Sequence, residues 1–344
     1  MKIISGGILV AAVVAGLAVL KTKDSQTSDE DTEMTETVAK PVGPAFNPDS
    51  AFAFTAKQCD FGPRVMNSEA HDRCGAWIVS KFKAYGCTVE EQKADLKGYD
   101  GTMLHSTNII ARFRPEAKRV MLCAHWDARP WADNDPDSTN HRKPVMAAND
   151  GASGVAVMIE VARQLSLMEK EQDGAKRLPA DVGIDFVCFD AEDWGLPQWE
   201  TNMDEVGDTW ALGALHFSTN LPAGFSPEFA VLLDMVGGEG AQFYREGMSV
   251  QYAPDVVNRV WNAAREAGFG SYFPNDVGGM VTDDHIPLNE KAGIPTADVI
   301  PYYPDCQQSS FGPTWHTIHD TMDHIDKGVL QAVGQTMIQM LWTL

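Results

Sequence analysis

The sequence predicts an α/β fold in which helices pack against a mostly parallel sheet. Short apolar runs, such as those at 182–190 and 229–236, have the length and composition of buried strands. They alternate along the chain with segments whose apolar residues recur at helical spacing, an order typical of a sandwich around a parallel sheet. Polar residues stand where several of these runs stop, and the ligand sites of such sheets gather at the carboxyl ends of the strands.

Four helices are expected from the spacing of apolar residues. The first covers about 70–85 and stops at Gly86. The second begins just after Asp150, and its apolar face extends to about residue 165. The third opens with Pro254 and ends at Gly268, and the last covers about 329–341.

Two β-rich runs lie close together in the chain. Residues 108–113 and 119–125 are joined by a short polar segment that contains Pro115. This pattern predicts an antiparallel hairpin at one side of the sheet.

The N-terminal segment differs in composition from the rest of the chain. Residues 3–20 are apolar or small without a break, which fits either a cleaved signal peptide or an uncleaved membrane anchor over residues 1–20. Residues 21–48 are rich in Asp, Glu, Ser and Thr, so we expect a disordered acidic tether there. Both alternatives predict an exported protein, either periplasmic and membrane-associated or secreted.

The remaining residues, 49–344, are expected to form a single catalytic domain, because no second linker or internal repeat interrupts them. The net charge of −21 argues against a nucleic-acid partner, since a phosphate backbone requires a basic face. Six cysteines occur without a C-x-x-C pair, and Cys123 and Cys188 lie inside apolar runs. We therefore expect these two to be buried thiols and not metal ligands.

Metal-binding side chains follow several of the predicted strands or lie in the loops beside them: His125, Asp150, Glu192, Asp193, Asp234, Asp283 and His316. Taken singly, residues of these kinds are more often structural histidines, solvated turns or helix caps than functional groups. Together they supply the imidazole nitrogens and carboxylate oxygens that zinc accepts. Glu192 and Asp193 directly follow an apolar strand, and adjacent buried carboxylates repel unless a cation lies between them or one is protonated. The sequence therefore predicts a metal site at this edge of the sheet.

The ordered motifs resemble a known family. They are AHWDARPW, AANDGASGVAVMIEVARQL, IDFVCFDAEDWG, LLDMVG, TDDHIP and TWHT. They are similar to the zinc exopeptidase fold in its glutaminyl cyclase branch, of the animal type that also occurs in bacteria. The resemblance covers roughly residues 50–344. It implies a three-layer α/β sandwich, with a mixed, mostly parallel central sheet and helices on both faces.

The resemblance also implies roles for individual residues. One zinc ion would be held by Asp150, Asp193 and His316. Glu192 would act as the general base, with Asp234 and Asp283 in an acidic network around it. The aminopeptidases of the same fold hold two zinc ions, and here the second would lie on His125 and Asp234.

Three features favour the cyclase over the aminopeptidase. Residues 283–287 have the cyclase form Asp-Asp-His-Ile-Pro, Trp315 precedes His316 as in the cyclases, and Trp199 is the candidate for a second aromatic wall of the substrate pocket. Two features depart from the animal enzymes. Asp193 replaces their usual Glu, and the pair of cysteines that they carry near the site is missing.

The implied activity is zinc-dependent cyclisation of N-terminal glutamine in peptides and proteins to pyroglutamate, with release of ammonia. One alternative is a di-zinc aminopeptidase of the same fold. The other is a catalytically silent binding module, although such proteins typically lose ligands or the base, and this chain keeps them all. Two insertions, 130–143 and 194–210, are expected to line the rim of the pocket.

Overall fold

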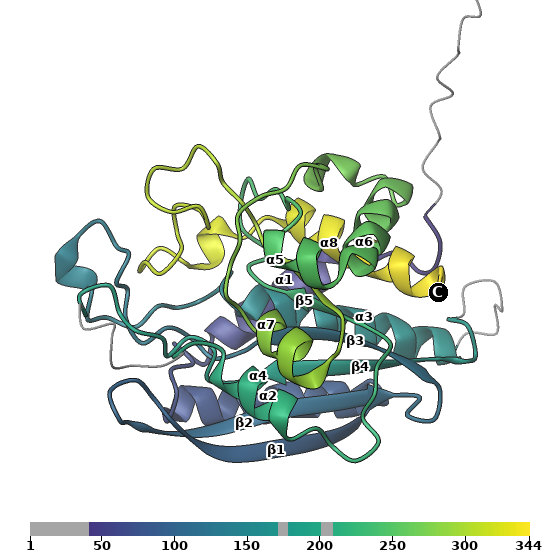
Figure 1. The fold of residues 1–344 in the computed structure, drawn as a ribbon, viewed down its shortest axis with the longest axis horizontal. Helices are drawn as coiled ribbons and strands as arrows, with labels where there is room; N and C mark the ends of the chain where they lie inside the picture. The colour runs from purple at the N-terminus through teal and green to yellow at the C-terminus, as the bar shows by residue number, and fades with distance from the viewer. Residues whose placement is uncertain (1–40, 171–177, 201–208) are drawn as a thin grey trace, which may run out of the picture. The chain divides into compact units, whose positions relative to one another are not determined.

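In the described part of the chain, six strands form one sheet in the order β1-β2-β4-β3-β5-β6 (Figure 1). The computed structural model describes residues 41–170, 178–200 and 209–344. The strands are β1 (Thr88–Lys97), β2 (Met103–Phe113), β3 (Lys118–His125), β4 (Val182–Phe189), β5 (Ala230–Leu233) and β6 (Thr296–Val299). Strands β4, β3, β5 and β6 pair in parallel, whereas β2 pairs antiparallel with both β1 and β4. The predicted mixed, mostly parallel sheet is confirmed.

Helices cover both faces of this sheet, as a three-layer sandwich requires. Along β3, Val120, Leu122 and Ala124 enter one apolar core, while Met121 and Cys123 enter a second core, because successive side chains of a strand point to opposite faces. The first core is filled by α1 (Pro48–Cys59), α2 (Glu69–Ala84), α3 (Ala152–Lys170), α6 (Pro254–Glu266) and α8 (Lys327–Trp342). The second core is filled by α4 (Leu212–Thr219), by the π-helix η5 (Leu288–Ala292) and by Ile294.

The four predicted helices are confirmed as α2, α3, α6 and α8. Their ends follow the expected signals: Ser68 caps α2 by accepting a hydrogen bond from the His71 N–H at 3.2 Å, and Pro254 is the first residue of α6. Two further helices are short and lie near the carboxyl edge of the sheet, namely α5 (Gly247–Tyr252) and α7 (His285–Pro287).

The predicted hairpin between residues 108–113 and 119–125 is wrong. Strand β4 lies between β2 and β3, with Ile110 opposite Val187 on one side and Val120 opposite Ile184 on the other. Strands β3 and β4 are buried along nearly their whole length, so burial of both places them side by side in the middle of the sheet. The true hairpin partner of β2 is β1, whose side chains are mostly polar and exposed.

The folded part begins earlier than residue 49. Residues 41–47, which we assigned to the tether, pack along α8: Val42 and Phe46 donate backbone hydrogen bonds of 2.8 Å to Gln339 and Gln335. The Phe46 ring is buried, and Asn47 caps α1. The predicted signal or anchor and the rest of the tether lie outside the described residues. No helix in the part that the structure describes is long and apolar enough to span a membrane.

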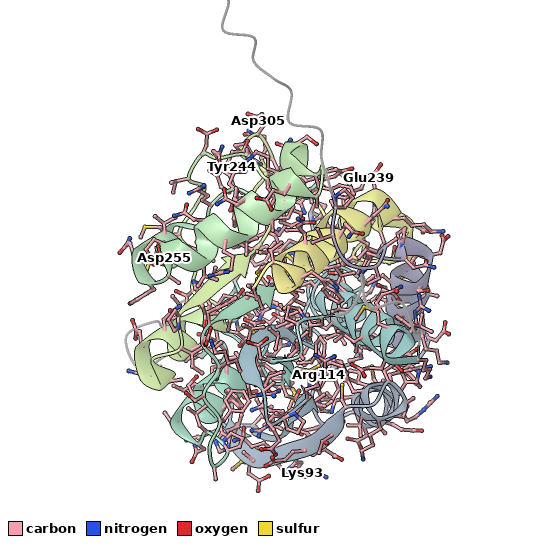
Figure 2. The ribbon with its side chains drawn as sticks, turned by 90° about the vertical axis from the view of Figure 1, so that its right-hand side faces the viewer. Lys93, Arg114, Glu239, Tyr244, Asp255 and Asp305 are labelled. Carbon is pink, nitrogen blue, oxygen red and sulfur yellow. The ribbon has the colours of Figure 1, made fainter. Side chains whose placement is uncertain are left out.

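The cysteines are all free thiols. Cys123 and Cys188 are fully buried, as predicted. Burial raises the pKa of Cys74 and of Cys87 to about 12, so these thiols are weak nucleophiles. Charged side chains such as Lys93, Glu239 and Asp255 lie at the periphery of the molecule instead (Figure 2).

Candidate active site

The topology brings the predicted site residues to one edge of the sheet. His125 is the last residue of β3, Glu192 and Asp193 follow β4, and Asp234 follows β5. Asp150 lies just before α3, in the loop that enters that helix. These ends meet because β3, β4 and β5 are parallel neighbours, so their carboxyl ends lie side by side.

Asp150, Asp193 and His316 come together as the sequence predicts. The Nε2 atom of His316 lies 3.2 Å from Asp193 Oδ1 and 3.5 Å from Asp150 Oδ2. All three residues are buried, and one ligand atom from each lies within 4.8 Å of the other two. Both carboxylate oxygens of Asp193 are buried without a hydrogen-bond partner, which is costly unless a cation binds them. The donor set and its unpartnered oxygens fit a zinc ion.

Surrounding residues hold two of these ligands in place. Asp320 accepts hydrogen bonds from the backbone N–H of Asn149 at 2.7 Å and of Asp150 at 3.1 Å. On the other side, Asp133 lies 3.5 Å from His316 Nδ1 and forms a buried ion pair with Arg129. Partners of this kind fix the orientation of metal ligands. We did not predict them, because they lie in loops without a periodic pattern.

His125, Asp150 and Asp234 form a second group beside the first. The Nε2 atom of His125 lies 2.9 Å from Asp150 and 3.2 Å from Asp234. Burial alone lowers the pKa of His125, but hydrogen bonds to Asp127, Asp150 and Asp234 raise it well above the ordinary value. The imidazole thus bridges two carboxylates directly. A β-carbon at residue 151 would lie 2.5 Å from the carbonyl oxygen of His125, so only glycine fits there.

Glu192 is buried and is aimed by its own backbone. The N–H groups of Glu192 and Asp193 each donate a hydrogen bond of 3.1 Å to Asp127, and Ala191 has a left-handed φ of 53°. Burial, together with the neighbouring charges of Asp193 and Asp283, raises the pKa of Glu192 well above its ordinary value. A carboxyl group of this kind can hold or accept a proton near neutral pH.

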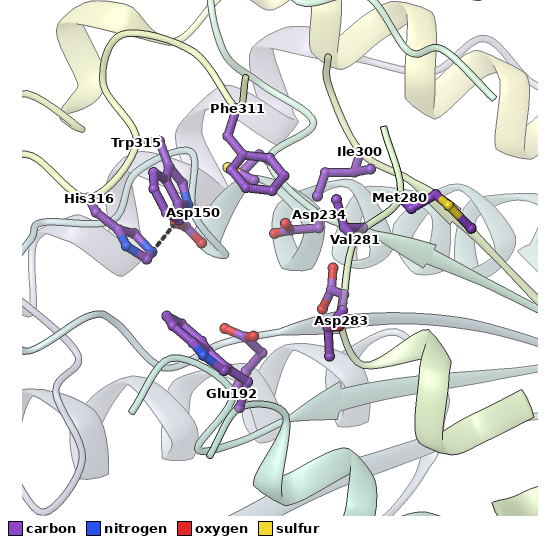
Figure 3. Close-up of a pocket in the computed structure, with 13 residues that line it drawn as sticks. Asp150, Glu192, Asp234, Met280, Val281, Asp283, Ile300, Phe311, Trp315 and His316 are labelled. Carbon is purple, nitrogen blue, oxygen red and sulfur yellow. Dashed lines mark ion pairs between the residues drawn. The ribbon is translucent and has the colours of Figure 1, made fainter. Parts of the chain in front are cut away.

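Asp234 and Asp283 complete the acidic cluster that the sequence predicts. Burial, aided by the charges of Asp283 and Asp150, raises the pKa of Asp234 to about 7 despite the hydrogen bond from His125. The pKa of Asp283 is also raised, chiefly by burial. The side chains of Asp234, Asp283 and Glu192 all point into the same cavity (Figure 3).

The cavity has a volume of about 450 Å³ and mostly apolar walls. Its lining consists of Asp150, Glu192, Trp210, Asp234, Met235, Met280, Val281, Thr282, Asp283, Ile300, Phe311, Trp315 and His316. The predicted wall residue Trp315 is among them, and its ring stacks on that of His316 with centroids 3.7 Å apart. Such a site, concave and apolar with a few convergent polar groups, suits a small side chain as ligand.

Trp199, predicted as the second aromatic wall, does not line this cavity. Its ring packs against Trp131 at 6.0 Å and under the guanidinium of Arg142 at 3.9 Å. Trp210 takes the expected place. The chain returns to the end of β4, where the Ala211 N–H donates a hydrogen bond to the Glu192 carbonyl at 3.1 Å. This contact brings Trp210 next to His316, a candidate metal ligand. Distance along the sequence from Asp193 therefore gave the wrong tryptophan.

The two insertions contribute differently. Segment 130–143 lies behind the site, where Asn134 donates hydrogen bonds to the carbonyls of His316 at 3.0 Å and Trp315 at 3.2 Å. No residue of this segment lines the cavity, so its predicted place at the rim is wrong. Segment 194–210 supplies Trp210 to the wall, and its residues 201–208 lie outside the described part.

Sequence and structure comparisons place this site in a family. The model of peptidase family M28 matches residues 108–341, which span β2 to α8 and include every candidate ligand. The chain belongs to peptidase family M28. The M28 protein is 30% identical over 277 residues to the aminopeptidase YwaD of Bacillus subtilis, a match that covers 76% of this chain and 50% of the relative. The chain thus spans about half the length of that relative.

Solved structures are more similar to this M28 protein. It superposes on the glutaminyl cyclase of Tannerella forsythia with a TM-score of 0.81 and 46% identity, covering 88% of this chain and 100% of that chain. For the glutaminyl cyclase of Bacteroides thetaiotaomicron, solved with bound N-acetylhistamine, the TM-score is 0.80 and the identity 45%, covering 88% and 99%. The fold and the predicted resemblance to the glutaminyl cyclases are confirmed.

Proposed function

We propose that this chain is a zinc-dependent glutaminyl-peptide cyclotransferase that converts the N-terminal glutamine of peptides and proteins to pyroglutamate. The observation that carries this proposal is the set of residues that line one cavity. Asp150 and His316 line it and form a candidate metal group with Asp193, and the buried carboxyl groups of Glu192 and Asp283 line the same cavity. The similarity to solved glutaminyl cyclases over nearly their full length supports the same reaction.

The walls of the cavity orient the substrate. Trp210, Trp315 and Phe311 line a cavity of about 450 Å³ that has room for a glutamine side chain, and they would hold its methylene groups so that the α-amino group lies near the γ-carbon. Closing a five-membered ring is an intramolecular reaction, so correct orientation supplies much of the rate. The exclusion of water by these rings also disfavours hydrolysis.

Glu192 moves the proton. It takes a proton from the α-ammonium group or amine while the nitrogen forms a bond to the γ-carbon. It then gives a proton to the departing side-chain nitrogen as the bond between that nitrogen and the γ-carbon breaks, and ammonia leaves. Burial, together with the charges of Asp193, Asp283 and Asp284, raises the pKa of Glu192 and so its proton affinity. Zinc, when bound by Asp150, Asp193 and His316, supplies Lewis acidity toward the γ-carbonyl oxygen.

Enzymes of family M28 are zinc-dependent, and we propose one zinc ion per chain. This number follows from the resemblance to the glutaminyl cyclases alone, because the group of His125, Asp150 and Asp234 could also hold a metal ion. The alternative is a di-zinc aminopeptidase, with the second ion on His125 and Asp234. It is favoured by the geometry of the second group and by the aminopeptidase relative.

We further propose that the protein is exported, on the strength of the apolar run at residues 3–20. The segment would serve as a signal peptide or as a membrane tether, and the catalytic domain would lie in the periplasm or outside the cell. The partners would be peptides and proteins with N-terminal glutamine. The charge of −21 argues against nucleic acid as a partner.

A mass measurement tests the proposed reaction. We expect a peptide with N-terminal Gln to lose about 17 Da, the mass of ammonia, on incubation with the purified chain. A peptide of the same sequence with N-terminal Asn is the control, because its shorter side chain cannot close a five-membered ring. Loss of a whole N-terminal residue from either peptide would replace the cyclase with the aminopeptidase, and an unchanged Gln peptide would contradict both.

A further inference from the structure

One wall of the cavity has no regular secondary structure of its own. Residues 278–282 belong to no helix or strand, yet they precede Asp283 directly, and Met280, Val281 and Thr282 line the cavity. The Met280 side chain is 58% exposed, so its packing contributes little to holding the segment in place. Something outside the segment must therefore hold it in place.

The Glu246 carboxylate anchors this wall beside two backbone hydrogen bonds, which run from the Gly278 N–H to the Arg245 carbonyl at 2.9 Å and from the Gly247 N–H to the Gly279 carbonyl at 2.8 Å. The Oε1 atom of Glu246 accepts a hydrogen bond from the Val281 N–H at 3.0 Å and another from the Met248 N–H at 2.8 Å. Its Oε2 atom accepts from the N–H and the hydroxyl of Ser249, at 2.6 and 2.7 Å. One buried carboxylate thus caps α5 and ties down the cavity wall.

His285 connects this anchor to the acidic cluster. It is the first residue of α7, two positions after Asp283. Its Nε2 atom lies 3.2 Å from Glu246 Oε2, and its Nδ1 atom lies 3.8 Å from Asp298 Oδ2 on β6. The contacts close a ring, because the Ser249 hydroxyl accepts a hydrogen bond of 2.9 Å from the Asp298 N–H.

The charges in this region explain why an imidazole lies there. Asp283, Asp284, Asp298 and Glu246 are all buried, and both oxygens of Asp284 and of Asp298 are without a hydrogen-bond partner. Buried carboxylates repel one another unless a positive or hydrogen-bonding group separates them. His285 is the basic side chain that lies between Glu246 and Asp298.

We propose that Glu246 and His285 form a positioning pair that holds Asp283 and the wall at 278–282 in the geometry needed for proton transfer by Glu192. Neither residue lines the cavity, so both act through Asp283 and Val281 and not on the substrate. The expected changes in kcat and KM rest on the proposed cyclase function. The pair gives a role to His285, the histidine of the Asp-Asp-His motif, which is neither a proposed zinc ligand nor the proposed general base.

Two substitutions of His285 separate the effect of its contact with Glu246 from the effect of a changed side-chain volume. The amide nitrogen of Gln reaches the place of Nε2, so His285→Gln keeps a polar contact with Glu246. Asn is shorter, so His285→Asn loses this contact, and Glu246→Gln removes the charge from the carboxylate side of the pair. The stability control is Asp185→Asn, which breaks the buried ion pair between Arg119 and Asp185 at the far end of β3 and β4.

Four readouts are compared in the full chain: melting temperature, zinc content, kcat and KM for a Gln peptide, and amide hydrogen exchange of the peptide covering 277–284. We expect H285N and E246Q to lower kcat about tenfold or more with unchanged zinc content, and to speed exchange at 278–283 about tenfold. We expect H285Q to stay within about threefold of wild type, and D185N to change only the melting temperature.

Other outcomes overturn the pair. If H285Q is as impaired as H285N, or if D185N lowers kcat equally, the effect is one of general stability. If zinc content falls in H285N, His285 belongs to a metal site and not to a positioning pair. If H285N does not fold, the comparison of E246Q with H285Q in the same four readouts decides whether the pair positions Asp283. If the wild-type chain does not cyclise Gln peptides, the proposed function fails, and hydrogen exchange at 278–283 still decides whether the anchor exists.

Discussion

The indole ring of Trp210 lies nearly parallel to the imidazole ring of His316, with centroids 5.9 Å apart and planes 12° apart. Trp315 stacks on the same imidazole at 3.7 Å. A candidate metal ligand is thus flanked by two aromatic rings that also line the substrate cavity. The rings shield the ligand from water and shape the space beside it.

Trp210 is expected to control substrate affinity. Trp210→Ala should raise KM for a Gln peptide about tenfold and change kcat less, because the ring contributes apolar surface of about 1–2 kcal/mol to the bound side chain. Steady-state kinetics measures both constants. Trp199→Ala is the matched control, since that ring packs outside the cavity, and it should leave KM within about twofold of wild type. Equal losses in the two variants would place Trp199 in the pocket after all.

Glu192 is expected to carry the proton transfer. Glu192→Gln keeps the size and burial of the side chain but removes its basicity, so kcat should fall about 10²- to 10⁴-fold. Circular dichroism and zinc content should match wild type, because the carboxylate is not one of the three proposed ligands. Normal turnover in this variant would sink the proposed mechanism.

The metal trio makes a prediction about stoichiometry. Removal of zinc with a chelator should abolish activity, and one equivalent of zinc per chain should restore it. His125→Gln should still bind about one zinc, whereas Asp193→Asn should bind none under the same conditions. Elemental analysis of the purified variants measures these contents. Two zinc ions in wild type that fall to one in His125→Gln would favour the di-zinc aminopeptidase.

Glu246 is expected to make stability depend on pH. Burial by itself raises the pKa of Glu246. The neighbouring His285 and the backbone N–H groups of Met248 and Ser249 have the larger, opposite effect, and together they lower this pKa to about 2. Because this value lies below the ordinary pKa of about 4.3 in the unfolded chain, the charged group stabilises the fold fully above pH ~4.3 and loses this effect as the pH falls toward 2.

Urea unfolding of wild type and Glu246→Gln tests this dependence. The difference in free energy of unfolding between the two should shrink by about 1–2 kcal/mol between pH 6 and pH 3. Glu69→Gln, which removes a carboxylate from the surface of α2, is the control and should show a constant difference. A constant difference for Glu246→Gln as well would show that its charge is not tied to folding.

The pattern of the sequence was most informative where one periodicity dominated. The helices α2 and α6 bury one apolar face, and α3 and α8 are buried over most of their length; the spacing of their apolar residues predicted all four within a few residues. Strand β1 was missed because its sequence, TVEEQKADLK, is mostly polar and exposed. The hairpin was misassigned because two strands adjacent in sequence need not pair when a third can bury more apolar surface between them.

The sequence by itself predicted a metal site at this edge of the sheet, from the chemical types of the side chains at the strand ends. The resemblance of its motifs to the glutaminyl cyclases then implied the trio of Asp150, Asp193 and His316 and the carboxyl groups around Glu192. Only the tertiary structure decided which tryptophan completes the wall and which residues hold Asp283. Those contacts join segments far apart in the chain, such as Glu246 to Val281 and Ala211 to Glu192. They depend on how irregular loops return to the sheet edge, and local periodicity carries no information about that path.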